Sequence, residues 1–94
     1  MHVFRFALHV TSTAPIAIDV GDETVDIQDA RGQSVHHRFE NGPFSFTPPA
    51  AGDYVVVVER YGDHRSPMRA RAAYVAKPLD LVGDRVGDRV GDRW

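Results

Sequence analysis

Regular alternation of apolar and polar residues is the feature that most constrains the fold of this chain. In residues 2–11 the apolar side chains fall on every second position, at Phe4, Phe6, Leu8 and Val10. The same spacing recurs in four further runs, which are residues 16–20, 24–28, 34–40 and 44–47. A period of two is the period of a β-strand with one buried face, because successive strand side chains point to opposite sides. The pattern therefore predicts a β-rich fold.

The individual runs predict which side chains face the interior. Residues 16–20 place Ile16, Ile18 and Val20 together, and residues 24–28 place Val25 and Ile27 inside with Asp26 outside. Residues 34–40 divide into one side with Val35, His37 and Phe39 and another side with Ser34, His36 and Arg38. A further strand is predicted from Tyr54 to Arg60, with Tyr54, Val56 and Val58 in the core.

Turn-forming sequences separate these runs. They are TSTAP, VGDE, DARGQ, NGP, PPAAGD and YGDHRSP, all rich in glycine, proline or aspartate. DARGQ has the length of a hairpin connection. Short strands at intervals of about ten residues are typical of an antiparallel β-sandwich. We predict an all-β sandwich of six or seven strands in residues 1–78, followed by a repetitive tail in 79–94.

The segment 66–77 fits two structures. As a helix it would begin with Ser66 as N-cap and Pro67 in the first turn. As a strand it would place Ala72 and Tyr74 on one face, and a sandwich needs a partner strand at this point. We favour the strand, although alanine is a poor strand former.

Composition narrows the class of protein. Ninety-four residues correspond to one domain, and the net charge of −2 argues against nucleic-acid or anionic-membrane binding. No stretch reaches the roughly 20 apolar residues of a transmembrane helix, and the N-terminus does not resemble a signal peptide. The chain has no cysteine, which suits a reducing compartment. We expect a cytoplasmic protein without a cofactor, and its high arginine and low lysine usage suggests a bacterial source.

The stretch FTPPAAGDYVVVVERYG, residues 46–62, resembles the Pro/Gly turn and Gly-x-Tyr entry to the penultimate strand of Ig-like and fibronectin-type sandwiches. Residues 15–62 are also similar to small uncharacterised bacterial β-sandwich proteins and, more distantly, to the competence-protein sandwich that inhibits a nuclease. The resemblance implies that Gly52 and Tyr54 are structural. Tyr54 would be a corner tyrosine, with its ring in the core and its hydroxyl bonded to loop backbone.

Two groups of residues are candidates for metal binding. Asp19, Asp22 and Glu23 surround one turn and could supply oxygen ligands to calcium, although they lack the pattern of a calcium loop. His36 and His37 are adjacent, so on a strand they point to opposite faces and cannot chelate one ion together. We expect ordinary turn and surface roles for both groups. No nucleophile elbow or phosphate loop is present, and we predict a non-enzyme.

The valines of the strand predicted from Tyr54 to Arg60 raise the question of what covers the outer face of the sheet. Val55 and Val57 should point away from the core. Leaving each side chain exposed to water forgoes about 1.5–3 kcal/mol of the free energy that its burial would contribute. We therefore expect a cover, which could be a second copy of the chain, a helix in 66–77 or the tail. The tail repeats VGDR three times and ends in the single tryptophan, so Val86, Val90 and Trp94 are further candidate contacts.

Two functions fit these features. The first is a small non-catalytic interaction module that binds a protein partner, or itself, through a sheet face or the tail. The alternative is a metal- or small-ligand-binding sandwich centred on residues 19–29 or on the histidines. Basic residues concentrate in the second half of the chain, at Arg60, Arg65, Arg69, Arg71 and Lys77, so the molecule should be electrically polarised.

Overall fold

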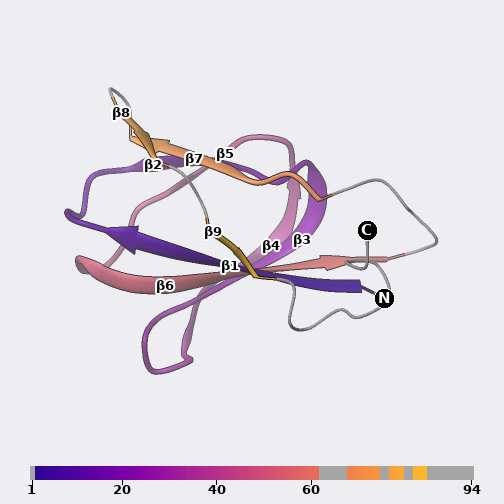
Figure 1. The fold of residues 1–94 in the computed structure, drawn as a ribbon, viewed down its shortest axis with the longest axis horizontal. Helices are drawn as coiled ribbons and strands as arrows, with labels where there is room; N and C mark the ends of the chain where they lie inside the picture. Colours follow the sequence, from indigo (N-terminus) through magenta and orange to yellow (C-terminus); the bar gives the residue numbers. More distant parts are fainter. Residues whose placement is uncertain (1, 62–67, 75–76, 80–81, 85–94) are drawn as a thin grey trace.

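A computed structural model describes residues 2–61, 68–74, 77–79 and 82–84 of the chain. These residues form two antiparallel β-sheets that face each other, as Figure 1 shows. The strands are β1 (His2–Val10), β2 (Ile16–Asp19), β3 (Asp22–Gln28), β4 (Ser34–Asn41), β5 (Phe44–Phe46), β6 (Gly52–Arg60), β7 (Arg71–Tyr74), β8 (Lys77–Leu79) and β9 (Val82–Asp84). The predicted all-β sandwich is confirmed.

The larger sheet has five strands in the order β4-β3-β6-β1-β9, and the smaller has four in the order β5-β2-β7-β8. The centre of the larger sheet is the pair β1 and β6, which are in register over nine residues from His2 opposite Arg60 to Val10 opposite Gly52. The chain changes sheet between β4 and β5, so these two strands are neighbours in sequence but lie at the edges of different sheets.

The core lies between the two sheets and uses the predicted alternation. The larger sheet contributes the inward side chains of β1, β3 and β6, and the smaller sheet contributes those of β2, β5 and β7. The buried members are Phe4, Phe6, Leu8, Val10, Ile16, Ile18, Val20, Val25, Ile27, Phe46, Tyr54, Val56, Val58 and Ala72. Their exclusion from water is the main stabilising contribution to this fold.

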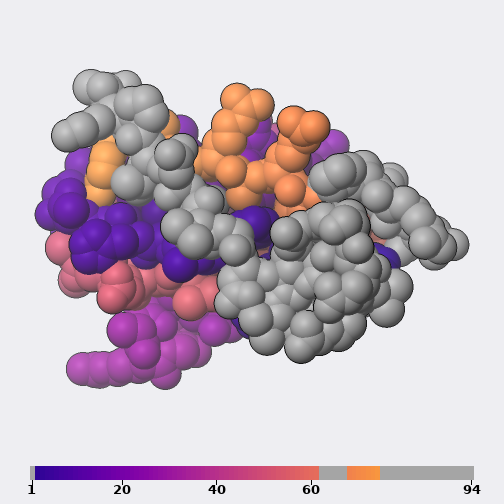
Figure 2. Space-filling model, in the orientation of Figure 1, coloured from indigo at the N-terminus to yellow at the C-terminus, as the bar shows by residue number. Residues whose placement is uncertain are grey.

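The turn between β3 and β4 projects away from the sandwich, as Figures 1 and 2 show. It is the predicted DARGQ hairpin connection. Asp29 organises it, because its side-chain Oδ1 accepts hydrogen bonds from the backbone N–H groups of Arg31 and Gln33, each at 2.9 Å. An aspartate that bonds to backbone ahead of it is a common way to close a short turn.

Strand β4 departs from simple alternation. A register shift opposite Ile27 and Gln28 gives β4 an additional residue, so the side chains on either side of this β-bulge no longer follow one count. Val35 packs against the core, whereas Phe39 lies on the outer face and is exposed. The prediction that Val35 and Phe39 share a face is therefore wrong.

The segment that had two interpretations is extended where the structure describes it. Residues 71–74 form β7, which pairs with β2 and buries Ala72 in the core. The helix alternative is wrong for residues 68–74. Strands β8 and β9 bring the number of strands above the six or seven expected, and β9, within the first VGDR repeat, pairs with β1.

Candidate functional site

Arg60 is the one buried charged residue in the described part of the chain, with 7% of its surface exposed. It is the last residue of β6, on the face that also carries Val56 and Val58, so its side chain enters the end of the core. Its Nε donates a hydrogen bond of 2.9 Å to Glu23 Oε2, and its guanidinium lies 5.5 Å from the centre of the Phe4 ring. The ion pair with Glu23 and the contact with the Phe4 ring offset the free-energy cost of removing the Arg60 charge from water.

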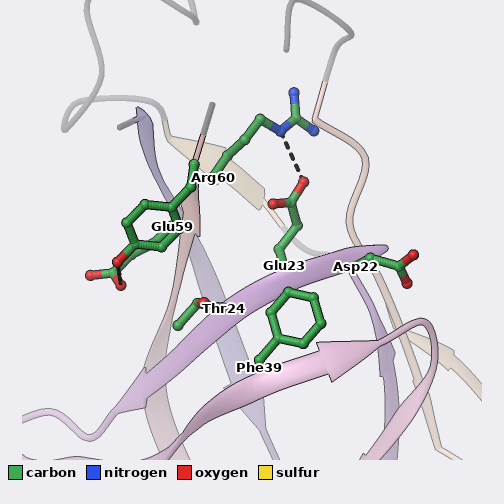
Figure 3. Close-up of a pocket in the computed structure, with 7 residues that line it drawn as sticks. Asp22, Glu23, Thr24, Phe39, Glu59 and Arg60 are labelled. Carbon is green, nitrogen blue, oxygen red and sulfur yellow. Dashed lines mark hydrogen bonds and ion pairs between the residues drawn. The ribbon is translucent and has the colours of Figure 1, made fainter. Parts of the chain in front are cut away.

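A depression of about 400 Å³ lies beside this ion pair, over the ends of β3, β4 and β6 (Figure 3). We call it the acidic depression. It is lined by Asp22, Glu23, Thr24, Phe39, Glu59, Arg60 and Tyr61. Phe39, Thr24 and Glu59 lie side by side on three neighbouring strands, because Thr24 is in register with both of the others.

Two exposed aromatic rings border the acidic depression. Phe39 is 55% exposed and Tyr61 is 60% exposed, and they are the large hydrophobic residues that stand out on the described surface. Figure 3 shows the Phe39 ring turned from β4 toward β3, below Glu23. Two large exposed rings at one depression are characteristic of contact surfaces.

The charge of the acidic depression is negative. Its lining holds three carboxylates, from Asp22, Glu23 and Glu59, and one guanidinium, from Arg60. The Glu23 carboxylate is occupied by Arg60, and Glu59 accepts a long hydrogen bond of 3.4 Å from the Tyr61 hydroxyl. Carboxylates beside aromatic faces attract cations, since the face of a ring carries partial negative charge. The arrangement suits a cationic group.

The three residues proposed for calcium have different surroundings. Asp19 Oδ1 accepts a hydrogen bond of 3.0 Å from the N–H of Gly21, which has a φ of 83° at the β2–β3 turn. Glu23 pairs with Arg60, and Asp22 is exposed. Across the described residues, no three histidine or acidic side chains gather as a metal ion would require.

The histidines contact carboxylates. His9 Nδ1 lies 2.6 Å from Asp53 Oδ1, His36 Nε2 lies 2.7 Å from Glu40 Oε2, and His37 Nδ1 lies 3.4 Å from Asp26 Oδ1. His36 also stacks on Phe44, with ring centres 5.0 Å apart. His36 and His37 point to opposite faces of β4, as predicted. His36 lies on the inner face, in register with the buried Ile27 of β3.

Val55 and Val57 point outward, as predicted, but differ in exposure. Val57 is 5% exposed and lies in register between Arg5 of β1 and Asp26 of β3. Val55 is half-buried. Neighbouring side chains on a sheet face cover one another, so Val57 offers little surface to a partner. Val86, Val90 and Trp94 lie outside the described residues and stay predictions.

Gly52 and Tyr54 form the beginning of β6. The Tyr54 ring is buried against Phe46, with ring centres 5.8 Å apart. Its hydroxyl donates a hydrogen bond of 2.6 Å to the carbonyl of Ala50 and accepts one of 3.3 Å from the Ala50 N–H, which is the geometry of a tyrosine corner. Gly52 has a φ of 142°, which side-chain-bearing residues rarely adopt.

Sequence reasoning did not identify the acidic depression. One signal was present, because counting alternate positions from Tyr54 places Arg60 on the core face, and a buried arginine requires a carboxylate nearby. The outward position of Phe39 could not be found in this way, because the bulge in β4 changes the alternation of inward and outward side chains.

In comparisons with protein-family models, curated proteins and solved structures, this chain has no match. In the part of the chain that the structure describes, no helix is long and apolar enough to cross a membrane.

Proposed function

We propose that this chain is a small non-catalytic interaction module, and that the acidic depression receives a lysine or arginine side chain of a protein partner. The observation that carries the proposal is the placement of Phe39 and Tyr61 beside the carboxylates of Asp22 and Glu59. The residues that line the acidic depression can bind a cation, and we assign them no catalytic role.

The energetics favour a contact at this place. Fully burying a phenylalanine side chain is worth about 1.5–3 kcal/mol, of which Phe39, at 55% exposure, would gain roughly half, and a cation over a ring adds about 0.5–2 kcal/mol. Aromatic residues at the centre of an interface commonly carry much of its binding energy. The Glu23–Arg60 pair contributes a fixed wall, because both side chains are largely buried.

Two wider assignments accompany this proposal. The bond from Tyr54 back to Ala50 supports an Ig-like sandwich. The lack of cysteine supports a reducing compartment, and we propose the bacterial cytoplasm.

The test uses fluorescence anisotropy with two labelled, capped octapeptides that alternate glycine with arginine or glycine with glutamate. The full chain should bind the arginine peptide and not the glutamate peptide. Phe39→Ser and Tyr61→Ser should each weaken binding about five- to tenfold, as loss of roughly 1 kcal/mol or more implies. Glu59→Gln should also weaken it, whereas Asp53→Asn, at the other end of β6, should not.

Trp94→Ser is the matched aromatic control. Equal binding by Trp94→Ser and by the unchanged chain supports the acidic depression, whereas loss of binding in Trp94→Ser alone would assign recognition to the tail and contradict the proposal. A mass that rises with concentration and is abolished by Phe39→Ser would replace the basic partner with a second copy, and would also contradict it.

A further inference from the structure

A second depression lies on the other side of the Glu23–Arg60 pair and has the opposite chemistry. It has a volume of about 310 Å³ and lies between the end of β2, the β2–β3 turn and the approach to β7. We call it the arginine depression. It is lined by Asp19, Val20, Gly21, Glu23, Arg60, Arg69 and Arg71.

The residues that line the arginine depression carry a net positive charge. Three guanidiniums and two carboxylates line it, and each carboxylate already accepts a hydrogen bond, so the guanidiniums of Arg69 and Arg71 are not neutralised by either. Glu23 bonds to Arg60 at 2.9 Å, and Asp19 accepts the hydrogen bond of Gly21. Asp19 is opposite Arg71 in the β2–β7 register, yet these two side chains do not form an ion pair.

Arg69 and Arg71 supply the donors. Arg71 is the first residue of β7, Arg69 lies two positions before it, and both are exposed. Neither side chain makes a hydrogen bond or ion pair with another residue of the described segments. Figure 2 shows side chains of residues 68–74, in orange, standing out from the surface of the molecule. Two guanidiniums this close in the chain can converge on a single anion.

Arg60 fixes the position of the third positive charge. Its side chain is 9% exposed, so the guanidinium is held by Glu23 and by the Phe4 ring instead of sampling many rotamers. Figure 3 shows the guanidinium directed toward the Glu23 carboxylate. A charge that is already ordered adds to anion binding without a further loss of conformational entropy.

We propose that the arginine depression binds an oxyanion group, either a phosphate or a carboxylate. Planar guanidiniums present paired N–H donors that match the oxygens of both groups, and such charge-assisted hydrogen bonds are stronger than neutral ones. The site goes beyond the proposed function, because its ligand has the opposite charge and its exposed donors, Arg69 and Arg71, do not line the acidic depression.

The test is a titration of the full chain with inorganic phosphate, followed by backbone amide NMR at constant ionic strength. Amide shifts should concentrate at residues 19–23 and 69–71 and reach saturation. Arg69→Gln and Arg71→Gln should each weaken binding about tenfold, as loss of a charge-assisted hydrogen bond implies. Arg31→Gln, an exposed arginine in the β3–β4 turn, is the matched control and should bind as the unchanged chain does.

A parallel titration with acetate separates the two sources of oxyanion. Saturable shifts with phosphate alone establish a phosphate site, and saturable shifts with acetate establish a carboxylate site. Sodium chloride that reproduces the shifts at equal ionic strength would overturn the proposal, as would unchanged affinity in both Arg69→Gln and Arg71→Gln. Binding of the arginine peptide to the acidic depression should persist in these two variants, so the two proposals fail independently.

Discussion

The two ends of β6 bury polar side chains by different means. At the beginning, the Tyr54 hydroxyl is satisfied by the backbone of Ala50, four residues upstream. At the end, the Arg60 guanidinium is paired with Glu23, which is 37 residues away and lies on another strand. A neutral hydroxyl can be satisfied within its own loop, whereas a buried cation requires a charge from elsewhere in the fold. One depression of about 320 Å³ borders the first end, whereas the Glu23–Arg60 pair at the second end lines two depressions.

The largest expected effect is at the charged end. Glu23→Ala should lower the free energy of unfolding by about 3–5 kcal/mol, because it removes the carboxylate to which the buried guanidinium donates at 2.9 Å. Urea denaturation measures this loss. The double variant Glu23→Ala with Arg60→Met should recover most of it, since no buried charge remains. A loss below about 1 kcal/mol in Glu23→Ala would show that the pair does not stabilise this end.

A smaller effect is expected at the neutral end. Tyr54→Phe should lower the free energy of unfolding by about 1 kcal/mol, because Ala50 loses its hydrogen-bond partner while the ring stays in place. Tyr61→Phe is the matched control, since its hydroxyl is exposed and its bond to Glu59 is long at 3.4 Å. Thermal unfolding of the two variants should separate them. Equal melting temperatures would remove the distinction between the two tyrosines.

The smallest effect concerns Asp26, a carboxylate in the middle of the larger sheet. Burial acts to raise the pKa of Asp26, but hydrogen bonds from Ser34 and Gln28 and the charge of His37 outweigh it, so the pKa lies below its ordinary value. A carboxyl whose pKa is lower in the folded state stabilises the fold above its unfolded pKa of about 3.9, and this contribution is lost as the pH falls through the lower folded value.

We therefore expect stability to fall below about pH 4, and the fall should be less steep in Asp26→Asn. Urea midpoints measured between pH 2.5 and 6 test this. Asp22→Asn is the control, because Asp22 is exposed, and it should follow the unchanged chain. An identical slope in Asp26→Asn would contradict a stabilising role for the hydrogen bonds around Asp26.

Much of the fold could be predicted from sequence, because local periodicity determines which face of a strand is buried. The inward residues of β1, β2, β3 and β6 follow from alternation alone. Strand β4 does not, because its bulge changes the count between Val35 and Phe39. Segment 66–77 remained ambiguous, since the alanines of 70–73 favour a helix locally and only pairing with β2 makes 71–74 a strand.

The candidate sites were less accessible to sequence reasoning, because they depend on contacts between distant segments. Tyr54 and Gly52 could be anticipated from one short motif. The partner of Arg60 could not, because several carboxylates precede it and only the register of β3 beside β6 selects Glu23. Arg69 and Arg71 were recognised as part of a basic half, but their approach to Asp19 follows from the β2–β7 pairing.

The bulge and the charged inner row of β4 also bear on how the molecule behaves at high concentration. An eight-residue strand at the edge of a sheet is ordinarily a template on which another chain can add a strand and begin to aggregate. Here the bulge interrupts the spacing of backbone groups, and the exposed Arg38 side chain would have to give up water on any incoming strand. This edge therefore resists intermolecular sheet extension.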